Sequence, residues 1–534
     1  MNKYIRFALP IFIGLLASCS AEEDAQIIDN PEIPVSGKKL TFSASIDADV
    51  TRTHQDGAKT VWSEDDAIWI FNDAKSSGNK GVFKLTSGKD TGSGTFEAQN
   101  EIAANEGENS NMFYAFYPSN ENSLSSVDGV VKATATIPAE QDPNVDLFKT
   151  GYQYMTAYTT GSSLSFKNVV SYFKVTVKSS NTFPISRIKI VANNLISEDG
   201  TDRETYSKKY LNIAGTFTSA INTEGRTTIA NGDITNGSSF VATTISNPDN
   251  AKHTYYLAVL PTAETLDFTL LLESEFKNGT QRIYQATKTG LTFAPGKVYD
   301  LGEFDAATLD SQNKVFDDVV DFDLPSGTIW ATKNVGAENP TDLGNYYQWG
   351  RITSYNRGTA SQSFQTGHTY SGNSDPVVLG CDDDIAYLAY PSTSSPFKNK
   401  YSMPTKDQAK EFTQGGYIWA VKVNSSDKYF TVYSKADYNS NTDKSKCRYI
   451  VMPIGGRKTN TSTFDNTGRA SYWSTKRDGN NAHWYDFRDN TGHGYTSPYG
   501  NVTDSQGNGR LIRAVVINKN IAPVKSYADL KAGN

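Results

Sequence analysis

Short segments with the spacing of β-strands recur along most of the chain. Residues 40–46 (LTFSASI) alternate hydrophobic and polar positions, and residues 113–117 (FYAFY) form an aromatic run that Pro118 ends. A two-residue period is that of a strand with one buried face, and Tyr and Phe, which favour strands, are abundant. No long stretch has the 3.6-residue apolar period of a helix. The pattern therefore predicts a mainly β protein.

One helix is expected in this β pattern. Thr405 can cap a helix over residues 406–412, and Asp407 adds a negative charge to its first turn. With 534 residues, the chain is long enough for three or four domains.

The N-terminus has the pattern of a bacterial lipoprotein signal. Lys3 and Arg6 precede an apolar run well short of the roughly 20 residues needed to cross a bilayer. The run ends in Leu-Ala-Ser-Cys, which resembles a lipobox, so residues 1–18 are the expected signal peptide and Cys19 is the expected lipidated residue. An ordinary signal peptide with a chance cysteine is the alternative. Residues 19–37 form the expected acidic stalk of a lipoprotein anchored in the outer membrane and exposed at the cell surface.

Further along, an ordered set of segments resembles a known family. The set consists of TRT at residues 51–53, WSEDDAI at 62–68, FYAFYP at 113–118 and FAPGKVY at 293–299. It is similar to the fimbrillin-like family of Bacteroidales surface and pilus proteins. The resemblance covers residues 38–304 and implies two consecutive β-sandwiches of transthyretin-like type, over residues 38–180 and 181–304.

Arg52 lies in the loop expected after the first strand. In fimbrillin-type pilins, cleavage at an arginine in that loop removes the first strand, and the groove left behind accepts a strand from the next subunit. The resemblance makes Arg52 a candidate processing site and makes other fimbrial subunits candidate partners. The alternative is an uncut arginine in a turn, because an anchored lipoprotein must keep its N-terminus.

A polar segment over residues 305–316 is the expected linker to a third domain. Beyond it come TIWATKNVG at residues 328–336, GNYYQWG at 344–350, YSMPTK at 401–406 and GRASYWST at 468–475. These blocks resemble the "Fibrobacter succinogenes major paralogous" domain, which is related to the C-type-lectin-like fold. The resemblance implies an α+β C-type-lectin-like domain over residues 317–520, with a tail over 521–534.

The last quarter of the chain alternates such blocks with segments rich in Asn, Ser, Thr, Gly, Asp and Tyr. These segments bury little, and their rigid rings and short polar groups suit a recognition surface. Trp473 is expected in the core, and one face of residues 482–487 is expected to be exposed. The predicted ligand-binding surface consists of Tyr472, Asn480, Asn481, His483, Tyr485, Arg488, Asn490, His493, Tyr495, Tyr499 and Asn501. The alternative is an inert, solvated loop.

The same composition resembles that of the variable proteins of diversity-generating retroelements. In those proteins, adenine-rich codons supply Asn, Tyr, Ser, Asp and His at the hypervariable positions of a C-terminal C-type-lectin-like domain. The chain is therefore a candidate variable protein.

Catalysis, metal binding and nucleic-acid binding find no support in the sequence. The 51 basic and 58 acidic residues form no basic stripe, which argues against DNA or RNA as partners. None of the five histidines lies in a metalloprotease or nucleophile motif, and the C-terminal module lacks the calcium-dependent sugar motifs EPN, QPD and WND. His483, Asp486, Asp489 and His493 fit loop residues facing water better than a metal site. We expect no enzyme activity, no catalytic residue, no cofactor and no metal.

Two cysteines, Cys381 and Cys447, remain after lipidation. They could form one disulfide in an exported protein or stay as free thiols. They are also the only pair that could serve an enzyme of the formylglycine-generating branch of the lectin-like fold.

The function expected from these features is adhesion or ligand display. Two sandwiches would raise a C-terminal domain that binds a glycan or a protein on a host or neighbouring cell. The alternative is a tip or accessory subunit of a fimbria, assembled by strand exchange after cleavage near Arg52.

Overall fold

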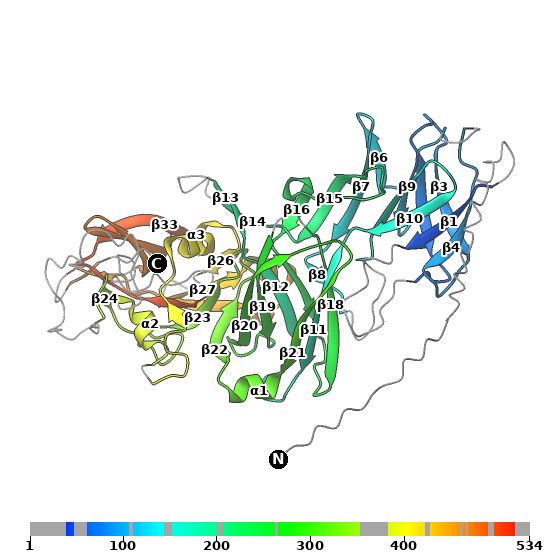
Figure 1. Ribbon diagram of the computed structural model, residues 1–534. Coiled ribbons are helices and arrows are strands. Elements are labelled where there is room, and N and C mark those ends of the chain that lie inside the picture. Colours follow the sequence, from blue (N-terminus) through cyan, green and yellow to red (C-terminus); the bar gives the residue numbers. More distant parts are fainter. Residues whose placement is uncertain are drawn as a thin grey trace, which may run out of the picture.

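The computed structural model describes residues 39–46, 61–105, 110–143, 152–199, 207–261, 265–352, 383–392, 394–421, 428–459, 463–465, 468–489 and 496–517. Strands predominate and the helices are short, which confirms the predicted mainly β fold. Three β-rich parts follow one another: an N-terminal barrel, a central sandwich and a C-terminal region (Figure 1). No helix in these ranges is long and apolar enough to cross a membrane.

The N-terminal barrel is closed around an aromatic core. Trp62 has no exposed surface, and its ring packs edge-on against Phe96, Tyr117 and Phe166, with centroid distances of 4.9, 5.5 and 5.6 Å. The strands follow the order β1-β10-β9-β5-β2-β3-β4. Their bounds are β1 (Thr41–Ile46), β2 (Ala67–Asn72), β3 (Lys80–Ser87), β4 (Ser93–Ala98), β5 (Phe113–Tyr117), β9 (Met155–Thr159) and β10 (Ser163–Asn168).

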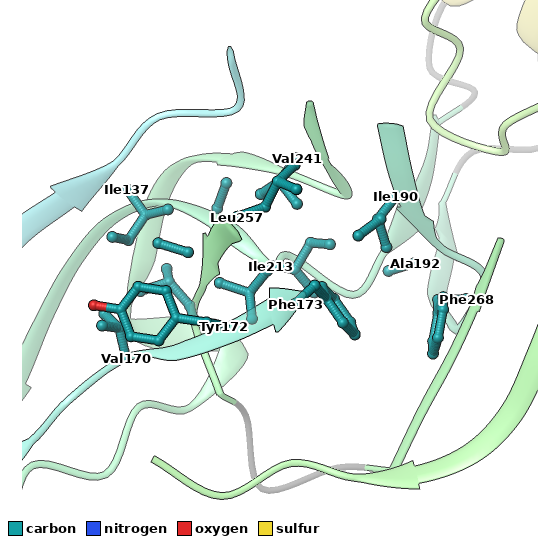
Figure 2. Packing of buried hydrophobic residues seen from close by; sticks show 14 of the residues in the cluster. Ile137, Val170, Tyr172, Phe173, Ile190, Ala192, Ile213, Val241, Leu257 and Phe268 are labelled. Carbon is teal, nitrogen blue, oxygen red and sulfur yellow. The ribbon is translucent and has the colours of Figure 1, made fainter. Parts of the chain in front are cut away.

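The central sandwich has sheets on both sides of one large core. In Figure 2, Phe173 of β11 lies close to Phe268 of β19, with ring centroids 5.0 Å apart. One sheet of this part has the order β18-β11-β21, and another has the order β16-β15-β7-β6. The hairpin β13-β14 also belongs to this part. The bounds are β6 (Leu124–Val127), β7 (Val130–Ile137), β8 (Glu140–Gln141), β11 (Ser171–Lys178), β12 (Arg187–Ala192), β13 (Leu195–Asp199), β14 (Ser207–Tyr210), β15 (Ala214–Ala220), η3 (Asn231–Asp233), β16 (Ile234–Ser238), β17 (Phe240–Thr244), β18 (Lys252–Val259), β19 (Thr265–Glu273), β20 (Gln281–Thr292) and β21 (Val298–Asp305).

The chain passes between the barrel and the central sandwich more than once. Strands β6 to β8 follow barrel strand β5, yet β7 pairs with β15 and β8 pairs with β17. Ile137 of β7 lies in the same core as Leu257 of β18 (Figure 2). β11 also pairs within the sandwich, so the strand pairing divides the chain after residue 168, earlier than the predicted boundary at 180. Alternation marks a strand but does not identify its partner, which is why the sequence placed this division differently.

The segment predicted to be a polar linker, residues 305–316, is folded. Asp305 caps helix α1 (Ala306–Ser311), and β22 (Val315–Asp321) follows at once. β22 pairs with β20 of the sandwich on one side and with β23 (Ile329–Asn334) on the other. A nine-stranded sheet of order β25-β35-β23-β22-β20-β19-β12-β17-β8 therefore runs through both parts. Backbone hydrogen bonds, rather than a flexible linker, join the C-terminal region to the sandwich.

Buried charges reinforce this junction. Nζ of Lys189 on β12, which has no exposed surface, lies 2.6 Å from Asp321 Oδ2 and 2.7 Å from Asp323 Oδ1. Arg187 lies 2.9 Å and Arg448 lies 2.7 Å from the Asp323 carboxylate. Burial opposes the ionised form of Asp323, but the three cations outweigh it and hold its pKa well below the usual value. We call Arg187, Lys189, Asp321, Asp323 and Arg448 the junction network.

The C-terminal region contains the predicted helix. α3 (Lys406–Gln414) begins at Thr405, whose hydroxyl accepts from the Gln408 backbone N–H at 3.1 Å, while the Gln408 side chain accepts from the Thr405 N–H at 2.9 Å. This reciprocal capping box confirms the predicted start of the helix. The other elements are β24 (Tyr347–Gln348), α2 (Ile385–Ala389), β25 (Tyr401–Ser402), β26 (Ile418–Val421), β27 (Tyr429–Ser434), α4 (Lys435–Ser440), η5 (Lys444–Lys446), β28 (Tyr449–Pro453), β29 (Arg457–Lys458), β30 (Phe464–Asp465), β31 (Arg469–Asp478), β32 (Asn481–Asp489), β33 (Thr496–Ser505), β34 (Gly509–Arg510) and β35 (Arg513–Val516).

Candidate ligand-binding surfaces

Strands β31, β32 and β33 form the antiparallel sheet that carries most of the predicted recognition residues. Tyr472 lies opposite Tyr485, and Trp473 lies opposite Trp484, in the pairing of β31 with β32. Residues 482–487 alternate between two faces, but no side chain among them is more than 8% exposed. The expectation that one of these faces is open is therefore wrong, because both faces of β32 are covered.

Tyr472 and Tyr485 belong to the core and not to a recognition surface. Both are fully buried, and their rings stack with centroids 5.5 Å apart. The Tyr472 hydroxyl donates to the Pro453 carbonyl at 3.2 Å. Phe412 of α3 and Trp330 of β23 stack on each other over this face, with ring centroids 4.1 Å apart. The prediction that they bind a ligand is wrong, because α3 and β23, which are distant in sequence, cover the rings.

His483 is also too buried to lie on an open surface. It is 8% exposed, and its backbone carbonyl accepts a hydrogen bond from Ser474 Oγ at 3.0 Å. Burial, with a smaller effect of nearby Lys406, lowers the His483 pKa to about 4. Its assignment to the ligand surface is corrected as well. Trp473 is fully buried, as expected, and its Nε1 donates to the Tyr347 carbonyl at 2.9 Å.

Ion pairs and a cation–π contact close the other side of this sheet. The buried Arg510 guanidinium lies 3.7 Å from the centroid of the Trp484 ring and is paired with Asp504. Burial lowers the Arg510 pKa to about 10, although Asp504 opposes this effect. Arg488, which is partly exposed, donates to the buried Asp486 at 3.4 Å. Arg488 therefore has a structural partner as well as some accessible surface.

Asn480 and Asn481 are the predicted residues that the structure leaves exposed, at the turn between β31 and β32. Tyr499 and Asn501 lie in β33, at positions where only the backbone is described. Asn490, His493 and Tyr495 lie outside the described residues, as do Cys19, Arg52 and Cys381. All of these stay predictions.

Cys447 is a free, buried thiol, and burial raises its pKa. Within the described ranges, no group of three or more His, Cys, Asp or Glu side chains is arranged to hold a metal ion.

The sequence reasoning missed a cavity of about 550 Å³ between the central sandwich and the C-terminal region. Its lining includes Tyr429, Thr431 and Tyr433 of β27, Tyr449 of β28 and the turn Asn278–Gly279. We call it the tyrosine cavity. The strict alternation over residues 429–434 (YFTVYS) was the available signal: its half-exposed positions face the cavity, and its buried ones face the core.

The match to a known family concerns the N-terminal half of this arrangement. Residues 51–302 match the fimbrillin-like family. The match confirms nearly the whole predicted range of the resemblance and supports an adhesin or fimbrial role at the cell surface, structural rather than catalytic. No curated protein matches the chain.

Solved structures similar to the chain include a candidate cell adhesion protein from Bacteroides ovatus, at 17% identity over 50% of this chain and 92% of that chain, with a TM-score of 0.30. Another is the fimbrial anchor protein Mfa2 from Porphyromonas gingivalis, at 7% identity over 44% of this chain and 77% of that chain, with a TM-score of 0.20.

The tyrosine cavity lies at the end of the fimbrillin-like region. The turn Asn278–Gly279 falls within residues 51–302, whereas β27 and β28 lie beyond them. The junction thus combines residues of the matched family with residues of the C-terminal region in one concave surface.

Proposed function

We propose that this protein is a surface adhesin that displays its C-terminal region as a ligand-binding module. Its anchor would be the lipidated Cys19 in the outer membrane, and its ligand would be a glycan or a protein on a host or neighbouring cell. The fimbrillin-like match supports the adhesin or fimbrial part of this proposal. The C-type-lectin-like assignment of residues 317–520 and the lipid anchor remain part of the proposal.

The nine-stranded sheet is the observation that carries display. A module that binds a ligand under load needs a stiff connection to its support, and β22 provides one by pairing with β20. The barrel and the C-terminal region lie at opposite ends of the described structure, with the sandwich between them (Figure 1). A polar linker would instead let the module reorient freely.

Binding by the whole chain tests the proposal. Residues 20–534, with the shared sheet intact, are applied to cultured host cells and to glycan and protein arrays, beside a variant with Asn480, Asn481, Tyr495 and Tyr499 changed to alanine. The matched control changes the exposed Asn181 and Asn250 of the sandwich to alanine. Binding by the chain to cells or arrays supports an adhesin, and its absence from both contradicts one. Loss in the first variant but not in the control supports the remaining predicted surface.

Diversification of the C-terminal segments is tested at the DNA level. A nearby reverse-transcriptase gene and an imperfect template repeat would support the hypothesis that the chain is a retroelement variable protein. The lack of both would contradict this hypothesis.

A fimbrial tip or accessory subunit is the second candidate, and β1 favours it. β1 lies between β10 and β4 in the closed barrel, and it buries Phe42 and Ala44 in the core. Removal of β1 by cleavage near Arg52 would open a groove that a strand from another subunit could fill. N-terminal sequencing of protein from cells, with gels run without boiling, tests this candidate. An intact N-terminus and the absence of polymer ladders would contradict it.

A further inference from the structure

We propose that the tyrosine cavity binds a short, uncharged oligosaccharide. This inference rests on the proposed function, since it assigns the ligand-binding role to a particular site and a particular ligand chemistry. The volume of the tyrosine cavity, about 550 Å³, falls within the roughly 300–1,000 Å³ typical of small-molecule sites.

One wall of the cavity is a strand face with regularly spaced aromatic rings. Tyr429, Thr431 and Tyr433 are half-exposed, while the alternate residues Phe430 and Val432 are fully buried. The Tyr433 ring lies 5.7 Å from that of Tyr449 on the neighbouring strand. Burial of the alternate residues anchors β27, so the outward rings are held in place before any ligand arrives.

Another part of the lining is a tight turn held against Tyr449. Asn278 and Gly279 have positive φ values of 55° and 82°, and Lys277 and Thr280 exchange backbone hydrogen bonds of 3.0 and 3.2 Å. Phe276, just before the turn, packs edge-on against Tyr449 at 5.4 Å. A Cβ added at Gly279 would lie 3.3 Å from the Tyr449 hydroxyl, so the turn approaches the ring closely. The two walls therefore form one fixed site.

The groups that face the cavity suit a ligand with apolar faces and many hydroxyl groups. Among the described residues, the hydroxyl groups of Tyr429, Tyr433 and Tyr449 have no hydrogen-bond partner in the protein. A tyrosine offers a flat apolar ring and a polar tip, which match the C–H face and the hydroxyl groups of a sugar ring. Such pairing satisfies the polar groups of both partners as water leaves.

The charge of the lining argues against an acidic ligand. Among the described residues of the lining, Lys444 is the one that carries a charge, and its Nζ already donates to the Tyr438 carbonyl and, at 2.7 Å, to the Asn441 carbonyl. Its ammonium group also lies 3.8 Å from the centroid of the Tyr438 ring. Because these contacts occupy Lys444, the described part of the lining offers no free cation to a carboxylate or sulfate. An uncharged saccharide fits best.

The pairing of β27 argues against a peptide strand that would add to β27. β27 lies between β26 and β28, so both of its backbone edges are paired within the sheet. Addition of a peptide strand requires an open edge. From β27 the cavity therefore receives side chains and no free backbone edge.

The test uses residues 20–534 on an array of maltotriose, cellotriose, xylotriose, chitotriose and mannotriose, with sialyllactose, trigalacturonic acid and a peptide library as other ligand classes. Tyr433→Ala and Tyr449→Ala should each weaken binding of a neutral trisaccharide by ~10-fold or more, as for a buried aromatic contact in an interface. Tyr433→Phe, which keeps the ring, should weaken it by less. The matched control is Tyr158→Ala, because Tyr158 is a half-exposed barrel tyrosine packed 4.9 Å from Tyr114.

Thermal melting and near-ultraviolet circular dichroism show whether each variant is folded. The inference is supported if both cavity variants lose binding of neutral sugars and the control variant keeps it. Equal binding by folded cavity variants overturns it, while the proposed adhesin function stands. Binding restricted to the charged sugars or to peptides overturns the ligand class, and binding of no ligand on the array overturns the inference itself. Adhesion of the same protein to cells then decides the proposed function separately.

Discussion

Removal of the Lys189 charge should destabilise the junction strongly. In Lys189→Met, an uncharged chain of similar length replaces an ammonium group with no exposed surface. Asp323 keeps Arg187 at 2.9 Å and Arg448 at 2.7 Å. The carboxylate of Asp321, fully buried and 2.6 Å from Lys189, keeps no ion pair in the junction network, since Arg448 donates to the backbone carbonyl of Asp321 and not to its carboxylate.

The magnitude follows from what Asp321 loses. Breaking a buried ion pair costs about 3–5 kcal/mol, because an uncompensated charge is left behind. Since only one of the two carboxylates is left without a cation, we expect the free energy of unfolding to fall by about 3 kcal/mol, at the lower end of that range. This is a large share of the roughly 5–15 kcal/mol that stabilises a typical domain.

Equilibrium urea denaturation at pH 7, followed by tryptophan fluorescence, measures this change in the free energy of unfolding. Asp321→Leu in the Lys189→Met background removes both charges, so the double variant should recover most of the loss. Lys252→Met is the exposed control, because Lys252 and Glu303 are both more than half exposed, and it should leave the midpoint unchanged. A Lys189→Met protein within 1 kcal/mol of the parent, or a double variant no better than the single one, would refute the reasoning.

Further substitutions test two buried titratable groups and the cap of α3. Burial raises the pKa of Glu273 to about 8 from 4.5, so the fold favours the protonated form, and the free energy of unfolding should fall as the pH rises from about 4.5 towards 8. Glu273→Gln should remove this fall, and a denaturation series across that pH range that keeps it would count against the assignment. The lowered His483 pKa, about 4 instead of 6.5, should make stability fall as the pH drops from 6.5 towards 4, and His483→Gln should reduce that loss in acid denaturation. Thr405→Ala should cost about 1 kcal/mol in urea denaturation by uncapping α3, whereas Thr405→Ser should cost little; equal effects would exclude the cap as the cause.

The features predicted correctly from the sequence are those set by neighbouring residues. The alternation of residues 40–46 became β1, and the capping signal at Thr405 became the start of α3. The ordered blocks from residue 51 onwards gave the fimbrillin-like resemblance that the family match bears out. Each of these depends on spacing within a few residues or on the order of motifs, both of which a sequence displays directly.

The errors concern contacts between distant segments. Tyr472 and Tyr485 have the composition of a recognition surface, but α3 and β23 cover them. The segment 305–316 looks like a linker because it is polar, yet it contains a helix and the first residues of a paired strand. Lys189 and Asp321 are separated by 132 positions, and nothing local to either marks it as buried and paired. A strand pattern gives the alternation of faces but not what covers them.

The junction links the stability of the protein to its proposed binding site. One wall of the tyrosine cavity, Asn278–Gly279, lies in the loop that joins β19 to β20, and the other lies on β27 and β28. The two walls keep their spacing only if the sandwich and the C-terminal region are held rigidly, which the pairing of β20 with β22 and the junction network provide. Lys189 does not line the cavity, so Lys189→Met leaves every ligand-contacting group in place. If the junction sets the spacing of the walls, this variant should still weaken neutral-sugar binding under conditions in which it stays folded. Unchanged affinity would show that the Lys189 charge does not set the spacing of the walls.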